Sequence, residues 1–289
     1  MPQGRRTSGR CAMAYEGYDC LRVRRARGVA FVTIDHPPIN LFDLALIQEM
    51  DRLGHEVADD PAVRVVVFDS ANPDFFIAHA DVSLIRMLPR DVTARPTELG
   101  LFHAMVDRFR TMPKATIAKI EGRTRGGGSE LVLSLDMRFA ARGRAILAQP
   151  EVALGIIPGG SGTQRLPRLM GRGRALEAIL GCEDFDADAA ERYGWVNRAL
   201  PPAELGPFVE RLASRIASFP AEAIALAKAA VAAAEGPVRD GLLEEAHRFN
   251  QALATDAAER RMRWFLASGG QTPAVERDLT ALIDGYREE

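Results

Sequence analysis

The sequence predicts an α/β fold whose last third is helical. Short runs of β-branched and aromatic residues alternate with segments of helical periodicity over residues 16–200, and no convincing strand follows Ala203. Strand, helix, strand in this order implies parallel βαβ units. We therefore expect a core over residues 16–200 and a helical region over residues 201–289. Residues 1–15 contain three arginines and no acid, and we expect a disordered extension there.

Three strands can be placed in chain order. The first is expected at residues 29–34, which read Val-Ala-Phe-Val-Thr-Ile before a His-Pro-Pro turn. A helix follows it, and further strands are expected at residues 63–68 and 115–120. The last strand leads through three glycines into a helix at residues 131–133. Apolar residues with helical spacing mark the first helix and the tail: Leu46, Met50, Leu53 and Val57; Leu242, Ala246, Phe249 and Leu253; and Met262, Phe265 and Leu266.

The composition is typical of a globular protein and excludes several classes of function. The chain has 289 residues, of which 47% are hydrophobic and 26% are charged. A net charge of -2 gives no reason to expect affinity for nucleic acid, and no apolar run is long enough to span a bilayer. Three scattered cysteines argue against a disulfide framework or a zinc site. We expect a cytoplasmic protein.

The loop at residues 76–81 is the first candidate for a ligand site. It follows a strand and an Asn-Pro-Asp turn, and its small residues would let a ligand approach the backbone closely. An ordinary connecting loop is the alternative interpretation.

A glycine turn is the second candidate. Gly126, Gly127 and Gly128 lie between a strand and a helix, so their amide hydrogens would lie at a positive helix end that suits an anion or a developing oxyanion. The turn matches neither a P-loop nor a dinucleotide-binding fingerprint. Glu130 falls near the third helical position, where it is either catalytic or a capping-box carboxylate.

Glu151 marks the third candidate. It lies among apolar residues, which raise the pKa of a carboxyl group and suit an acid that holds a proton near neutral pH. An edge carboxylate in water is the alternative. The following stretch contains Ser161, but it is not a Gly-x-Ser-x-Gly motif and no histidine is obviously placed to serve that serine, so a serine hydrolase is not indicated.

Taken in order, these segments resemble the enoyl-CoA hydratase/isomerase (crotonase) family, and the similarity runs from Tyr18 to Thr272. Each motif is weak evidence alone, but their common order is strong evidence. The motifs are Pro38 to Phe42, Phe76 to Asp81, Gly126 to Glu130 with Asp136, Gln149 to Glu151, and Pro158 to Leu166.

The resemblance implies a crotonase-like spiral of ββα turns and a C-terminal helical region that builds trimers or hexamers. It also implies an acyl-CoA thioester substrate. Because coenzyme A would be part of that substrate, we expect no separate cofactor. No metal, membrane or nucleic acid partner is expected.

The resemblance also implies the roles of individual residues. The amides of Ala78 and Gly127 would form an oxyanion hole for the thioester carbonyl, Glu130 would be the base that activates water, and Glu151 would be the acid. The presence of both glutamates favours hydration of a trans-2-enoyl-CoA to a 3-hydroxyacyl-CoA. Substrate-binding positions would be Ala80, Asp81, His79, Gly126, Gly159 and Arg125.

Two residues depart from the family pattern. His79 stands where the family commonly has glycine, and Arg125 stands where it usually has a small or aliphatic residue. One interpretation places both in the acyl pocket and favours a polar or acidic acyl group. The other pairs Arg125 with an acid at a subunit interface and packs His79 against the adenosine part of CoA. The C-terminal lysines and phenylalanine that often close over CoA are not evident at residues 267–272.

Two rival functions are possible on this scaffold. The first is a sister enzyme on the same scaffold: an isomerase, dehydratase or thioester hydrolase that acts on a polar acyl group. The second is a non-catalytic or RNA-binding member. The basic stretch from Arg165 to Arg174 is short, which makes the second rival the weaker one.

Overall fold

Two β-sheets form the core of the structure, a computed structural model that describes residues 15–90, 95–234, 236 and 238–286. The larger sheet has six strands in the order β1-β2-β3-β5-β7-β10, and the smaller has four in the order β4-β6-β8-β9. The larger sheet contains β1 (Leu21–Ala26), β2 (Val29–Ile34), β3 (Val65–Ser70), β5 (Ala115–Ile120), β7 (Met137–Ala141) and β10 (Arg198–Leu200). The smaller contains β4 (Phe75–Ile77), β6 (Arg123–Arg125), β8 (Ile146–Ala148) and β9 (Phe185–Asp186).

The chain repeats one pattern: a strand of the large sheet, a strand of the small sheet, then a helical segment. The pairs β3–β4, β5–β6 and β7–β8 lead into α2 (Val82–Arg86), α4 (Gly127–Ser134) and the 3₁₀ helix η1 (Glu151–Leu154) respectively. The expected spiral of ββα turns is therefore confirmed. The predicted parallel pairing is confirmed too, since β2 pairs with β3 and β3 with β5 in parallel. The antiparallel β1 and the second sheet were not predicted.

Alternation along the central strands explains why they read as continuous apolar runs. Val65 and Val67 face one side of the large sheet, while Val66 and Phe68 face the other. Both faces are covered, because α8 (Pro202–Ala217) packs on the first and the helices α1 (Leu44–Asp59) and α3 (Leu101–Thr111) pack over the second. A strand buried on both faces has no polar positions to alternate with.

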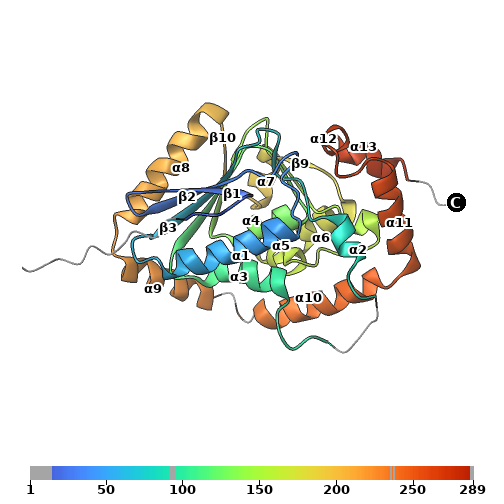
Figure 1. Cartoon of the computed structure of the whole chain (residues 1–289), viewed down its shortest axis with the longest axis horizontal. Coiled ribbons are helices and arrows are strands. Elements are labelled where there is room, and N and C mark those ends of the chain that lie inside the picture. Colours follow the sequence, from blue (N-terminus) through green and yellow to red (C-terminus); the bar gives the residue numbers. More distant parts are fainter. Residues whose placement is uncertain (1–14, 91–94, 235, 237, 287–289) are drawn as a thin grey trace, which may run out of the picture.

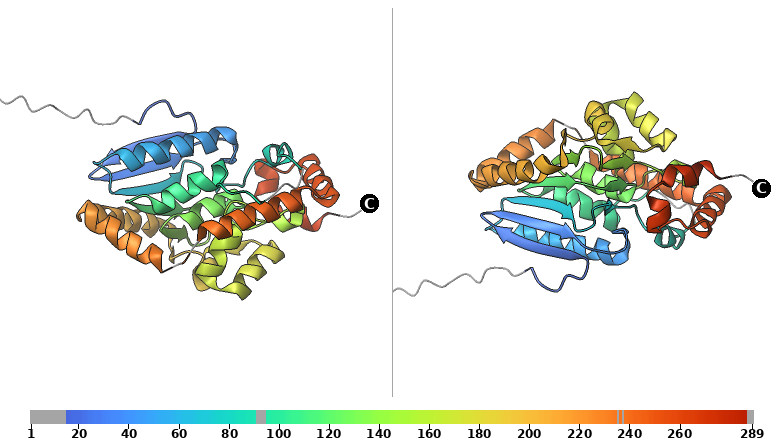
Figure 2. Two further views of the ribbon diagram at one scale, coloured as in Figure 1. Left: turned by 90° about the horizontal axis from the view of Figure 1, so that it is seen from below. Right: turned by 90° about the horizontal axis from the view of Figure 1, so that it is seen from above.

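The predicted helical tail is confirmed, and it divides into two groups. Every described element after residue 201 is a helix. In Figures 1 and 2, α8 and α9 (Ala221–Ala233) lie at one end of the long axis, whereas α11 (Asp256–Ala267), α12 (Pro273–Glu276) and α13 (Leu279–Asp284) lie at the other. The long helix α10 (Val238–Leu253) precedes the second group. Within the tail, α8 thus belongs to the core, whereas α11–α13 cover the opposite end of the molecule.

Some expectations concern parts that the structure does not describe or does not test. The expected N-terminal extension falls almost entirely on residues 1–14, outside the described residues. Within the described chain, no single helix is long and apolar enough to cross a membrane, although the bent pair α8 and α9 would pass that test of length and composition together.

The remaining helices are α5 (Gly162–Met170), α6 (Arg172–Gly181) and α7 (Ala187–Tyr193).

Candidate active site

A cavity of about 510 Å³ lies between the loops that follow β4 and β6, the start of α4 and the C-terminal helices. This is within the size range of small-molecule sites. The carboxyl ends of β4 and β6 point toward it, and the first residues of α4 and η1 form part of its wall. Most other lining residues are apolar; they include Phe42, Leu44, Ile47, Leu84, Ile85, Leu101, Phe102, Leu154, Ile156, Phe249, Phe265 and Ile283.

The glycine turn leads from β6 directly into α4. Gly126 has a φ of 49°, in the left-handed region that favours glycine, and its N–H donates to Ala148 O at 3.1 Å. A Cβ atom there would lie 3.0 Å from Glu151 Oε1 and 3.3 Å from His79 Cβ. Glycine is therefore required both by the backbone angle and by the close approach of two functional side chains.

Two backbone amides are available at this wall. Gly127 begins α4, so its N–H has no acceptor within the helix. Ala80 forms a parallel bridge with Phe42 in which Phe42 bonds only the flanking groups, His79 O and Asp81 N. The N–H of Ala80 therefore points away from Phe42, and it lies 3.5 Å from the position of a Cβ atom on Gly127. Both residues line the cavity.

The predicted donor Ala78 is corrected to Ala80. The N–H of Ala78 donates to Ile39 O at 3.2 Å, and Ala78 is buried away from the cavity lining. The N–H of Ala78 is thus already used by Ile39, whereas that of Ala80 is directed away from Phe42, so the candidate donor lies two residues further along the same loop. The other predicted donor, Gly127, does lie at the cavity.

Glu130 is buried on the first turns of α4 with its carboxyl group against another backbone turn. Its Oε1 accepts from Gly160 N at 2.7 Å and from Gly162 N at 2.9 Å. The carboxyl group does not reach back to its own helix start, so the capping-box alternative does not describe it. Burial, and then the nearby Glu151 carboxyl group, raise the pKa of Glu130 well above its usual value.

Glu151 begins η1 and faces the same cavity. Burial raises the pKa of Glu151 to about 8. Gln149 Nε2 lies 3.4 Å from both of its carboxyl oxygens. Glu151 is 8% exposed, so the alternative of an edge carboxylate in water does not hold. Two carboxyl groups thus face one cavity, and neither has a close arginine or lysine partner among the ion pairs of the described residues.

Five of the six predicted substrate-binding residues line the cavity: Ala80, Asp81, His79, Gly126 and Gly159. Arg125 does not, which corrects the expectation that it adds a positive charge there. Its guanidinium is fully buried and bonds Asp184 through two nitrogens, at 2.7 and 2.6 Å. The acid that pairs with Arg125 is therefore in the same chain, not across a subunit interface.

Several residues at the site were not predicted from sequence. Phe102 packs between the two backbone turns, within 2.5 Å of where a Cβ atom on Gly160 would lie. Glu245 on α10 bonds His103 Nε2 at 3.0 Å and accepts from Thr163 N at 2.9 Å, which places a third carboxyl group behind the cavity. Glu276 on α12 bonds His79. Glu245 lies one residue from an apolar position of the predicted helical face, which was the only local signal for it.

Ser161 has a structural role that agrees with the exclusion of a serine hydrolase. Its hydroxyl lies 3.2 Å from both Ser134 Oγ and Glu130 O, and it thereby ties the start of α5 to α4. Among the described residues, no group of three or more His, Cys, Asp or Glu side chains could hold a metal ion.

Comparison with known proteins adds the following similarities. Residues 24–269 match a family model described as enoyl-CoA hydratase/isomerase. The chain is 36% identical over 259 residues to a crotonyl-CoA hydratase of Syntrophomonas wolfei, covering 88% of this chain and 96% of that protein. It is 33% identical to a short-chain-enoyl-CoA hydratase of Clostridium acetobutylicum, covering 82% and 91%. A crystal structure from Streptomyces avermitilis, provisionally assigned as an enoyl-CoA hydratase, is 41% identical with a TM-score of 0.86, covering 93% and 98%.

Proposed function

The chain belongs to the enoyl-CoA hydratase/isomerase family, and from that premise we propose that it adds water across the 2,3 double bond of an enoyl-CoA thioester. One observation carries the proposal: two buried carboxyl groups, Glu130 and Glu151, face the same cavity as two free backbone donors, Ala80 and Gly127. Coenzyme A is part of the substrate, and no further cofactor is required for this chemistry.

The two amides would stabilise the charge that develops on the thioester oxygen. When a hydroxyl group adds to the β-carbon, the electron pair of the double bond moves onto the carbonyl oxygen and forms an enolate. Ala80 and Gly127 donate to that oxygen, and a fixed donor of this kind contributes about 3–4 kcal/mol to the transition state. The amino end of α4 adds a positive partial charge at Gly127.

The two glutamates would supply base and acid. Burial raises the pKa of both, and the nearby Glu151 carboxyl group raises that of Glu130 further, so the pair retains at least one proton near neutrality. The amides of Gly160 and Gly162 stabilise negative charge on Glu130. Glu130 therefore takes a proton from water as the water oxygen bonds the β-carbon, and Glu151 gives its proton to the α-carbon. Transfer of the water proton from Glu130 to Glu151 restores the starting state.

The acyl group is most simply a short alkyl chain. The argument for a polar or acidic acyl group rested on Arg125 and His79, and both have partners in the protein. The remaining lining is mainly apolar, with Phe102 close to the reaction centre. The names of the two relatives, a crotonyl-CoA hydratase and a short-chain-enoyl-CoA hydratase, support the same choice.

We extend the proposal to assembly and location. Helix α9 has no buried side chain and exposes Leu226 and Val231, so its apolar surface is suited to contact with another subunit. A homotrimer, or a hexamer built from two trimers, is the assembly that we propose, in the cytoplasm. Light scattering at micromolar concentration tests it, and a monomer would contradict it.

A panel of trans-2-enoyl-CoA thioesters tests the reaction. Hydration removes the conjugated double bond, so the absorbance of the enoyl thioester falls, and the product is a 3-hydroxyacyl-CoA by mass spectrometry. Crotonyl-CoA is expected to be a better substrate than a carboxylated analogue. Release of free CoA, or a shifted double bond without added water, would instead show a hydrolase or an isomerase.

A further inference from the structure

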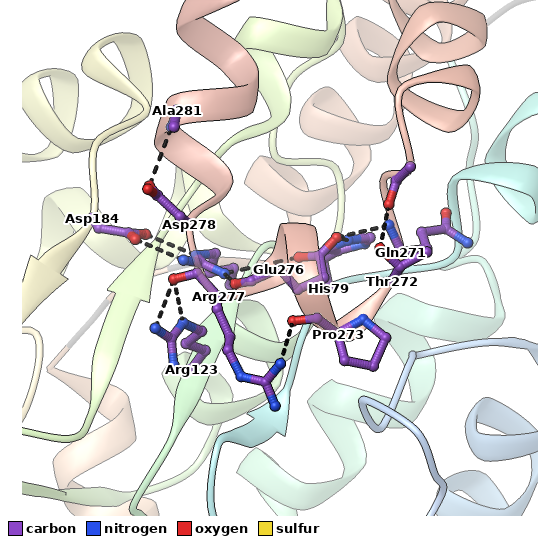
Figure 3. Close-up of polar contacts among 12 residues, drawn as sticks. His79, Arg123, Asp184, Gln271, Thr272, Pro273, Glu276, Arg277, Asp278 and Ala281 are labelled. Carbon is purple, nitrogen blue, oxygen red and sulfur yellow. Dashed lines mark hydrogen bonds and ion pairs between the residues drawn. The ribbon is translucent and has the colours of Figure 1, made fainter.

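His79 lines the cavity and connects the loop that carries Ala80 to helix α12. It precedes Ala80, the proposed oxyanion donor, and its Nδ1 lies 2.8 Å from Ala80 O. Its Nε2 lies 2.9 Å from Glu276 Oε1 on α12. The imidazole is 5% exposed and packs edge-on against Phe265, with 5.7 Å between ring centroids. Figure 3 shows His79 and Glu276 facing each other across the contact between Nε2 and Oε1.

The two contacts of the imidazole determine its protonation. A carbonyl oxygen can only accept, so Nδ1 must donate to Ala80 O. Glu276 Oε1 also accepts from Gln271 N at 2.8 Å, as expected of an ionised carboxylate, so Nε2 must donate as well. An imidazole that donates from both nitrogens is an imidazolium.

Arg125 and Asp184 complete a balanced set of charges around this contact. Arg125 Nη1 donates to Glu276 O at 2.7 Å and lies 3.8 Å from Glu276 Oε2. With Asp184 bound to the same guanidinium, two positive and two negative groups lie together; His79, Arg125 and Glu276 are buried and Asp184 is partly exposed. This balance allows a fully buried Glu276 to remain ionised, because buried charges require close partners.

Glu276 therefore holds both of the segments that lead to the proposed donors, the loop after β4 and the end of β6. Its side chain bonds the residue before Ala80, and its backbone carbonyl bonds Arg125, two residues before Gly127. We propose that His79 is a buried imidazolium that positions the Ala80 amide in the oxyanion hole, and that Glu276 is the positioning residue that keeps it charged. The inference rests on the proposed function only for its effect on turnover.

The charged groups that face His79 agree with this assignment. Burial alone would lower the pKa of His79, but the Glu276 carboxylate outweighs burial and raises it, while Arg125 on β6 opposes the rise. Glu151 on η1 also faces the imidazole, and the charge of His79 lowers the pKa of Glu151. Three elements thus present titratable or charged groups to His79, and the carboxylate on α12 is the one that hydrogen-bonds to it.

The protonation state can be measured without catalysis. The chain has five histidines, so ¹⁵N-labelled histidine gives a spectrum simple enough to assign with a His79→Gln variant. Both ring nitrogens of His79 are expected to carry hydrogen at neutral pH, and to keep it above the ordinary histidine pKa of 6.5. A singly protonated His79 at neutral pH would overturn the proposal.

Turnover tests the positioning. Glu276→Gln keeps the shape of the side chain but removes its charge, so His79 should become neutral. We expect kcat for crotonyl-CoA to fall about 10- to 100-fold with KM within a few-fold, because a displaced donor acts mainly in the transition state. Arg277→Met is the matched control: it breaks an exposed ion pair with Asp74 at the next residue and should change neither the histidine spectrum nor kcat.

A parent-like kcat in Glu276→Gln, with His79 shown to be neutral, would overturn the positioning role. If Glu276→Gln does not fold by circular dichroism, His79→Gln carries the same kinetic test. A parent protein that hydrates no enoyl-CoA would sink the proposed function, while the histidine spectrum would still decide the protonation of His79.

Discussion

Glu151 and Glu276 are both buried glutamates, but their pKa values are shifted in opposite directions. Burial raises the pKa of Glu151 to about 8. Burial would also raise the pKa of Glu276, but His79, Gln271 and Arg125 together hold it below its usual value. The amount of burial therefore does not decide whether a glutamate is charged.

The position of the cations decides it. His79 hydrogen-bonds to the Glu276 carboxylate and Arg125 lies 3.8 Å from it, and no comparable pair of cations reaches Glu130 or Glu151 in the described chain. A carboxyl group without a cation keeps its proton and can give it to a substrate, whereas a paired one stays ionised and holds structure. The same residue type is thus proposed to act in catalysis at Glu151 and to hold structure at Glu276.

The largest effect should come from the unpaired glutamates. Glu130→Gln and Glu151→Gln keep the side-chain shape but remove proton transfer, so each should lower kcat by about 10²–10⁴-fold with little change in thioester binding. Glu259→Gln is the control for the substitution itself, since Glu259 pairs with Arg86 and neither residue lines the cavity. Steady-state kinetics on crotonyl-CoA check this, and parent-like turnover by either site variant would contradict the two-glutamate mechanism.

The paired glutamate should matter more for stability. Glu276→Ala leaves two buried cations, His79 and Arg125, with a single carboxylate, Asp184, for the pair. Loss of one partner from a buried ion pair costs about 3–5 kcal/mol. Urea denaturation of Glu276→Ala and Glu151→Gln measures the contrast. An equal change in the free energy of unfolding for the two variants would remove the distinction between them.

The donor assignment gives a third test of where function lies. Replacing the Ala80 amide with an ester, by incorporation of lactic acid, deletes one N–H and should lower kcat by about 10²–10³-fold. The same replacement at Ala78 removes only a hydrogen bond to Ile39 and should leave most of kcat. A larger loss of kcat at Ala78 than at Ala80 would restore the original prediction.

The smallest effect is a difference in the pH dependence of stability. The raised pKa of Glu151 means that the unfolded chain loses this proton above 4.5 while the folded chain keeps it to about 8, so Glu151 lowers the free energy of unfolding as pH rises through that window. The lowered pKa of Glu276 stabilises the fold above 4.5, and this contribution is lost as pH falls below that value.

Denaturation at a series of pH values separates these two slopes. Glu151→Gln should flatten the decline between pH 4.5 and about 8, by a few kcal/mol at most. Glu276→Gln should flatten the loss below 4.5 instead. Identical curves for both variants would show that the two carboxyl groups titrate alike.

Local patterns predicted much of the fold and the two glutamates. The strand at residues 29–34 matches β2 and that at residues 115–120 matches β5, because β-branched runs between turn residues are a local signal. The glycine turn was found because a helix start needs no distant partner. The short strands of the second sheet carry only two or three residues each, too few for periodicity to indicate them.

What failed depended on pairing between distant segments. The choice between Ala78 and Ala80 is made by Ile39, which accepts from the N–H of Ala78, and by Phe42, whose bridge leaves the N–H of Ala80 free. The partners of His79 and Arg125 lie at Glu276 and Asp184, and no spacing along the chain connects a loop residue to an acid 197 positions later. Their departure from the family pattern was visible in the sequence, but its cause was not.

The dependence of the Ala80 loop on Glu276 has a consequence for the order in which the chain is made. The two proposed donors and the two proposed catalytic glutamates lie within the first 151 residues, yet Glu276, which holds the segments beside the donors, is added after almost all of the others. A growing chain on the ribosome can thus build the sheets before it can finish the oxyanion hole. The ability to turn over substrate should therefore appear late and abruptly, when the segment around Glu276 leaves the ribosome and packs against His79 and Arg125.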